Sequence, residues 1–303
     1  MPAAEHPPEP SLLFVPNFSE GRSERVVDAL GATVGSHARL LDTHFDADHN
    51  RCVFTVAGEP AAVVDAAGAG AAHALELIDL RGHQGVHPHI GALDVCPLVW
   101  IGHSGREAAR TAAREAGERV AALGIPVFFY GELASSEERR ERAYFRRGGP
   151  AELRRRMGAG ELRPDLGPDA PHPRAGATLV TARPPLVAFN LVLDTPNPEI
   201  ARAVAGRLRE SGGGLRGVRA LGFPLEGGRS QVSVNVHDAE AVPLAAVVEE
   251  VKRLAAEHQA RPVAAELVGL APEAALREYP GEPPIAGLEP DRHLIERVLA
   301  GDR

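Results

Sequence analysis

The chain of 303 residues has little cysteine and almost no lysine. Two cysteines, Cys52 and Cys96, cannot build a disulfide framework, and both lie in apolar segments typical of inert core thiols. The first ten residues lack the basic segment and apolar run of a secretory signal, and no apolar run has the length of a membrane span. We therefore expect a cytoplasmic protein with a short disordered N-terminal tail and no membrane partner.

Basic side chains are fewer than acidic ones, and the net charge is −8. This balance argues against a general nucleic-acid-binding protein, which needs a basic surface. Lys252 is the single lysine, so the basic residues are almost all arginine. A GC-rich genome is the favoured explanation, and selection for fork-shaped contacts to anions is the alternative.

Several cofactor and nucleophile motifs are also absent from the sequence. It has no P-loop, no GxGxxG after an expected strand and no GxSxG. The run Gly212–Gly214 follows an expected helix, where a glycine C-cap is the favoured interpretation. We therefore expect no nucleotide cofactor.

The most informative stretch is Asp79–Pro97, which is rich in glycine and contains three histidines. Its glycines and internal proline are incompatible with a helix, and residues 92–99 form an apolar run typical of a buried strand. Without a helix, the HxxxH spacing gives little support to a metal site. Imidazole gains and loses protons near neutral pH, which suits acid–base catalysis. Of His83, His87 and His89, we favour His87 because it is held closest to the strand entrance.

A polar turn at residues 45–51 precedes this stretch and contains Asp46, Asp48 and His49. Aspartate and asparagine favour turns by bonding their own backbone, and we prefer this explanation for Asp46 and His49. A carboxylate here also suits the role of orienting a catalytic histidine. For Asp48 both interpretations remain open.

Amphipathic segments and short apolar runs form two similar series, each strand–helix–strand–strand–helix–strand. The first series consists of residues 12–15, 23–35, 39–44, 52–56, 60–77 and 92–99, with an added helix at 106–123 and an added strand at 126–130. The second consists of residues 186–193, 196–210, 218–223, 230–236, 244–258 and 262–268. Residues 135–166 are expected to form a connecting segment between the two series, with a helix at 151–157. We expect an α+β fold of two subdomains, residues 1–180 and 181–303, with the ligand site at their interface.

Seven ordered motifs carry a resemblance to a known family. They are Val15–Arg22, Asn50–Arg51, His87–Pro88 with Gly91–Pro97, Pro126–Glu132, Pro164–Pro168, Gly176–Thr178 and Ala188–Asn190. At these positions the chain resembles the glutamate formimidoyltransferase (formiminotransferase) family, the folate-dependent enzymes of histidine breakdown. Animal members carry a second, cyclodeaminase domain, and the resemblance here is to the stand-alone form.

The resemblance implies two ferredoxin-like βαββαβ subdomains with a folate tunnel between them. It implies transfer of a formimidoyl group between N-formimidoyl-L-glutamate and tetrahydrofolate, giving 5-formimidoyltetrahydrofolate and L-glutamate. Tetrahydrofolate is a co-substrate, and neither a metal nor a nucleotide is required. The family's catalytic histidine falls on His87. Its folate-contacting loop falls on Gly167, Pro168, Asp169, Ala170, Pro171, His172, Pro173, Arg174, Ala175 and Gly176.

Two positions depart from the family pattern. His89 stands where an arginine usually follows His-Pro, and His44 stands where animal members have an acid. If that acid orients the catalytic histidine, Asp48 has taken over its role, so the expected catalytic residues are His87, Asp48 and His44. The departures leave open a folate-binding paralogue with another acceptor or no transfer activity, and a metal-dependent hydrolase is less favoured. The partners expected are small molecules and, on base rates, a second copy of the chain.

Overall fold

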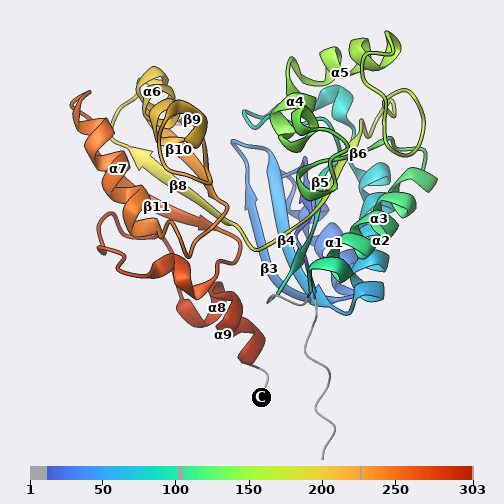
Figure 1. Ribbon diagram of the computed structural model, residues 1–303, viewed down its shortest axis with the longest axis horizontal. Coiled ribbons are helices and arrows are strands. Elements are labelled where there is room, and N and C mark those ends of the chain that lie inside the picture. The colour runs from blue at the N-terminus through green and yellow to red at the C-terminus, as the bar shows by residue number, and fades with distance from the viewer. Residues whose placement is uncertain (1–11, 102–104, 226, 302–303) are drawn as a thin grey trace, which may run out of the picture. The chain divides into compact units, whose positions relative to one another are not determined.

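The computed structural model describes residues 12–101, 105–225 and 227–301. Its internal contacts divide the chain into two compact units, Met1–Pro184 and Pro185–Arg303 (Figure 1). The expected N-terminal tail lies outside the described residues. Each unit combines one sheet with helices, so the fold is of the mixed type that the α+β prediction required.

One mixed sheet forms the centre of the first unit. Its strands are β1 (Leu12–Phe14), β2 (Asn17–Phe18), β3 (Arg39–Asp46), β4 (Arg51–Gly58), β5 (Leu93–Trp100), β6 (Val127–Phe129) and β7 (Thr178–Arg183). Strands β1 and β2 both lie between β4 and β5, and β3 pairs with the other edge of β4. These pairings are antiparallel, whereas β5, β7 and β6 run parallel.

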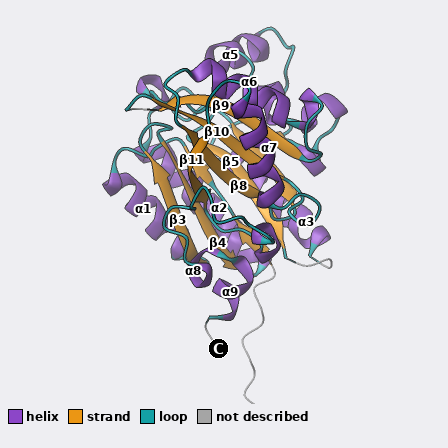
Figure 2. Ribbon diagram, turned by 90° about the vertical axis from the view of Figure 1, so that its left-hand side faces the viewer, coloured by secondary structure: helices purple, strands orange, loops and turns teal. Residues whose placement is uncertain are grey.

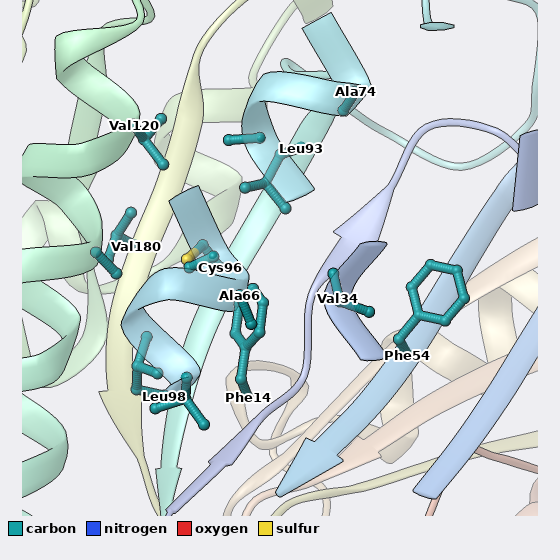
Figure 3. Close-up of a cluster of buried hydrophobic side chains, with 14 of the residues drawn as sticks. Phe14, Val34, Phe54, Ala66, Ala74, Leu93, Cys96, Leu98, Val120 and Val180 are labelled. Carbon is teal, nitrogen blue, oxygen red and sulfur yellow. The ribbon is translucent and has the colours of Figure 1, made fainter. Parts of the chain in front are cut away.

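Helices cover this sheet on two faces. They are α1 (Glu24–Gly35), α2 (Pro60–Leu77), α3 (Arg106–Ala122), α4 (Arg142–Arg146) and α5 (Gly149–Gly158). The first three enclose the main core, where Phe14 and Val180 of the sheet lie with Ala66 and Val120 of the helices (Figure 3). Helices α4 and α5 close a smaller core on β5, β6 and β7.

Strand β5 is buried on both faces. Cys96 belongs to the main core and its neighbour Val95 belongs to the smaller one. Burial on both faces explains why this strand reads as a continuous apolar run rather than as an alternation. It also fixes the end of the preceding histidine loop in a rigid part of the unit.

The second unit contains an antiparallel sheet in the order β11–β8–β10–β9. Its elements are β8 (Val187–Leu193), α6 (Pro198–Leu208), β9 (Val218–Leu225), β10 (Arg229–Val236), α7 (Leu244–Ala256), β11 (Pro262–Val268), α8 (Pro290–His293) and α9 (Ile295–Ala300). Helices α6 and α7 cover one face of the sheet (Figure 2) and share a core with it. Among the described residues, no helix combines the length and apolarity needed to cross a bilayer.

Two features of the first unit differ from the sequence prediction. Strand β7 was not predicted, because its parallel neighbours β5 and β6 are far away in the sequence. Residues 135–166 were expected mainly to form a connecting segment. The helix predicted at 151–157 is confirmed as part of α5, but α4 was not predicted, and the two helices pack Phe145, Leu153 and Met157 into the smaller core. A few large side chains therefore anchor a segment whose composition is mostly polar.

Candidate functional site

A small hollow in the first unit gathers the predicted histidines. Residues 83–92, all described, contain no helix, as the sequence predicted, and they lead into β5. The residues that line the hollow are Ser19, His49, Asn50, Arg51, His83, His87, His89 and Asp94. They come from the end of β2, the β3–β4 turn, the start of β4, the histidine loop and β5.

Asn50 holds the histidine loop against the β3–β4 turn. Its side-chain amide donates to the carbonyl of Gln84 at 2.9 Å, and its side-chain oxygen accepts from the N–H of Gly21 at 3.0 Å. Its φ of 48° lies in the left-handed region, which asparagine adopts more readily than most residues. A Cβ at Gly85 would lie 2.5 Å from the carbonyl oxygen of His49, so only glycine permits this approach.

Buried Asp94 fixes the other end of the loop. Its carboxylate accepts from the N–H of Ile90 at 2.7 Å, and the hydroxyl of Ser19 donates to the carbonyl of Gly91 at 2.7 Å. Asp94 also forms an ion pair with Arg146 of α4. The loop is therefore held at both ends by side chains from other elements.

His87 faces the guanidinium group of Arg51, the first residue of β4. The Nη1 atom of Arg51 lies 3.1 Å from Nε2 of His87. Because a guanidinium group only donates, Nε2 accepts, and the imidazole is neutral. Burial lowers the pKa of His87 well below its usual value, and the charges of Arg51, Arg146 and Arg142 lower it further. Burial also lowers the pKa of Arg51, to about 9, so Arg51 remains cationic at pH 7.

A hydrogen bond between Asp46 and His49 lies beside His87. Nδ1 of His49 is 2.7 Å from Oδ1 of Asp46, which also accepts from the backbone N–H of His49 at 2.7 Å. The side-chain bond to His49 lowers the pKa of Asp46. The ring centroids of His49 and His87 are 6.3 Å apart. The bond from the backbone N–H of His49 to Asp46 agrees with the turn interpretation of these two residues, and His49 also lines the hollow.

The other two predicted catalytic residues lie nearby. The backbone carbonyl of Asp48 accepts from the N–H of Val86 at 3.2 Å, so Asp48 helps to dock the histidine loop. His44 stands two residues before Asp46 on β3, on the same face of the strand, and its charge contributes to the lowered pKa of Asp46. The catalytic roles of Asp48 and His44 stay predictions.

The remaining two histidines of the loop contact each other. The rings of His83 and His89 meet edge to face, with centroids 4.1 Å apart. Nε2 of His83 lies 3.2 Å from the carbonyl oxygen of Asn50, and burial lowers the pKa of His83. Within the described ranges, no three histidine, cysteine, aspartate or glutamate side chains are grouped as a metal site would require.

The predicted folate-contacting loop, residues 167–176, pairs with the end of the histidine loop. The N–H of Ala92 donates to the carbonyl of Ala175, and the N–H of Ala177 donates to that of Ile90, both at 2.9 Å. The structure thus brings the two predicted binding segments side by side.

A local hairpin shapes the folate-contacting loop. His172 and Gly176 exchange two backbone hydrogen bonds, of 2.8 and 2.9 Å, and Nδ1 of His172 accepts from the N–H of Ala175 at 3.1 Å. Arg174 pairs with Asp79 at 3.4 Å. Residues 167–170, which precede this hairpin, are exposed.

Sequence reasoning missed the arginines of α4. The available signal was the pair Arg142 and Arg146, four residues apart around the buried Phe145. Their neighbours are mostly charged, so nothing in the local pattern distinguished these two arginines from the surface ones.

Family models for the formiminotransferase domain match most of the chain. The model described as the N-terminal subdomain of the formiminotransferase domain matches residues 11–183, and the model described as the formiminotransferase domain matches residues 188–279.

Known proteins with related sequences are described as formimidoyltransferases. The chain is 40% identical over 266 residues to a glutamate formimidoyltransferase of Streptococcus pyogenes serotype M1, covering 86% of this chain and 89% of the relative. It is 37% identical over 268 residues to that of Thermoplasma acidophilum, covering 86% and 88%. It is 40% identical over 272 residues to the formimidoyltransferase-cyclodeaminase of Gallus gallus, covering 86% of this chain but only 50% of that relative.

Proposed function

Because the chain belongs to the formiminotransferase family, we propose that it transfers a formimidoyl group between N-formimidoyl-L-glutamate and tetrahydrofolate. The products are 5-formimidoyltetrahydrofolate and L-glutamate. The observation that carries this proposal is the 40% identity to a glutamate formimidoyltransferase across 89% of that enzyme. Tetrahydrofolate acts as a co-substrate, and the chemistry needs no metal and no nucleotide, since only a proton accompanies the transferred group.

His87 is the proposed acid–base catalyst. N5 of tetrahydrofolate attacks the formimidoyl carbon, so an N–C bond forms and a tetrahedral intermediate results. His87 accepts the proton of N5 and returns it to the glutamate nitrogen, whose bond to the same carbon then breaks. The neutral imidazole and its lowered pKa support the first of these proton transfers.

Other residues have proposed positioning roles. Residues 167–176 contact folate, and their pairing with the histidine loop supports this role. Asp48 and His44 orient the catalytic histidine directly or through the turn, and the hydrogen-bonded pair Asp46–His49 is a further candidate for that role.

The proposed domain organisation is two ferredoxin-like subdomains, residues 1–180 and 181–303. The strand orders β5–β1–β4–β3 and β11–β8–β10–β9, each antiparallel, support a βαββαβ unit in both. The folate tunnel between the subdomains stays a prediction, as does a homodimer. Free, buried Cys52 and Cys96 are compatible with the proposed cytoplasmic location.

A turnover assay tests this function. Purified protein is supplied with tetrahydrofolate and N-formimidoyl-L-glutamate, and 5-formimidoyltetrahydrofolate is followed as it forms. We expect His87→Ala to lower kcat by about 10²–10⁴-fold while tetrahydrofolate still binds, because only the proton transfer is lost.

Exposed His37, at the end of α1, provides a matched control, and His37→Ala should keep full activity. If the His87→Ala variant turns over as fast as the wild type, His87 is not the catalytic residue. In the same assay, unchanged kinetics of Asp48→Asn would reject an orienting role for Asp48.

A further inference from the structure

Arginines outnumber carboxylates around His87. We propose that Arg51, Arg142 and Arg146 bind the carboxylates of the amino-acid half of the formimidoyl donor and thereby select a dicarboxylic amino acid. This inference rests on the proposed transfer reaction, and it names the chemical group that the same site recognises.

Arg51 is half-buried and has unused hydrogen-bonding capacity. Its Nη1 contacts His87 at 3.1 Å, while its Nε is buried and has no hydrogen-bond partner among the residues that the structure describes. A guanidinium group offers five N–H donors in a planar fork, and a buried donor without an acceptor is costly. A carboxylate that accepts two bonds from this fork removes that cost.

Helix α4 supplies the other two arginines. Arg142 and Arg146 are four residues apart, so their side chains lie on one face of the helix. The ion pair with Asp94 anchors Arg146; the side chain of Arg146 is 10% exposed and that of Asp94 is 3% exposed. Nε of Arg146 is likewise buried without a partner in the described part of the chain. The charges of Arg142 and Arg146 reach Arg51, whose pKa they lower.

The charge of this cluster is unbalanced. Asp94 forms an ion pair with Arg146, and its charge also acts on Arg51. By contrast, Arg155 on the surface donates to two carboxylates, those of Glu152 and Glu161. Like charges brought together in a poorly solvated place oppose folding, and they are explained by a ligand of opposite charge.

The position of the cluster favours the amino acid over the glutamate tail of folate. In N-formimidoyl-L-glutamate, the α-carboxylate is attached to the carbon that bears the reacting nitrogen. It therefore lies close to any group that returns a proton to that nitrogen, and Arg51 contacts that group, His87. In folate, an aminobenzoyl group separates the tail from N5. We assign the α-carboxylate to Arg51 and the side-chain carboxylate to Arg142 and Arg146.

Steady-state kinetics of Arg142→Gln test the assignment. We expect the KM for N-formimidoyl-L-glutamate to rise about 10-fold or more, because a charge-assisted hydrogen bond is lost, while the KM for tetrahydrofolate changes less than about twofold. Turnover of N-formimidoylglycine, which lacks the second carboxylate, should be poor in the wild type and insensitive to the substitution. Exposed Arg147, directly after α4, gives the matched control Arg147→Gln, which should behave as wild type.

Binding measured without turnover separates this inference from the proposed function. Calorimetry with L-glutamate, in the presence of tetrahydrofolate, compares His87→Ala with the double variant His87→Ala/Arg142→Gln, and circular dichroism confirms that both fold. Glutamate binding that weakens in the double variant supports the carboxylate site even if the wild type shows no turnover.

Two results would overturn the inference while leaving the transfer reaction intact. One is an unchanged KM for the donor in Arg142→Gln. The other is a raised KM for tetrahydrofolate that disappears with tetrahydropteroate, which lacks the glutamate tail, because the arginines then bind folate instead.

Discussion

The charges around His87 determine whether its imidazole is neutral or protonated when the reaction begins. Burial is the largest cause of its lowered pKa, followed by Arg51, Arg146, Arg142 and His49. A neutral imidazole can accept the first proton at pH 7. A substrate carboxylate bound to the arginines would offset their charge and raise the pKa of His87 again. The enzyme–substrate complex is then better able than the free enzyme to hold the proton that must be returned.

This electrostatic argument predicts the pH dependence of Arg51→Gln. Removing a cation in contact with His87 stabilises the protonated imidazole, so the pKa of His87 should rise toward its usual value of 6.5. The acidic limb of kcat/KM, which reports the free enzyme, should therefore move to higher pH. NMR titration of labelled histidine checks the same pKa without turnover. A limb that stays in place, or one that Arg147→Gln moves equally, would contradict the assignment.

At the scale of elements, the local sequence pattern was sufficient to predict helices and strands whose bounds depend on local signals. Helix α2 and strand β11 have the predicted bounds, Pro60–Leu77 and Pro262–Val268, because proline at a first helical turn and a short apolar run are local signals. Strand β7 depends on distant partners and was missed. The histidine loop was predicted, but its contact with Arg51 was not, because that contact joins residues 36 positions apart.

The pairing of the two loops makes Gly176 a sensitive position. Its φ is 68°, and a Cβ there would lie 2.0 Å from the carbonyl oxygen of Ile90, in the backbone of the histidine loop. We expect Gly176→Ala to lower the free energy of unfolding by more than the roughly 1–2 kcal/mol that a left-handed conformation alone costs, and to weaken tetrahydrofolate binding. Urea denaturation and folate titration measure the two effects.

Gly160 provides the control for Gly176. Its φ is 71°, but among the described residues, its own chain neighbours aside, none lies within 4 Å of a Cβ placed here, so Gly160→Ala carries the conformational cost without the clash. Equal losses of stability in the two variants would show that the close approach between the loops contributes nothing.

At the scale of the whole molecule, the described core residues form separate clusters in the two units. Leu208 at the end of α6 is fully buried in the second unit, and Leu30 of α1 is fully buried in the first. The single tryptophan, Trp100, ends β5 and packs against the main core of the first unit, so its fluorescence reports on that unit. Circular dichroism reports on the helices of both units, so the two probes distinguish where unfolding begins.

Leu208→Ala should therefore destabilise one unit without the other. Removing a buried leucine side chain costs about 2–5 kcal/mol, so an early phase should appear in urea unfolding followed by circular dichroism. The midpoint of Trp100 fluorescence should stay at its wild-type value, whereas Leu30→Ala should lower it. If Leu208→Ala moves both probes together, the two units unfold as one cooperative body, and their separate cores do not define separate units of stability.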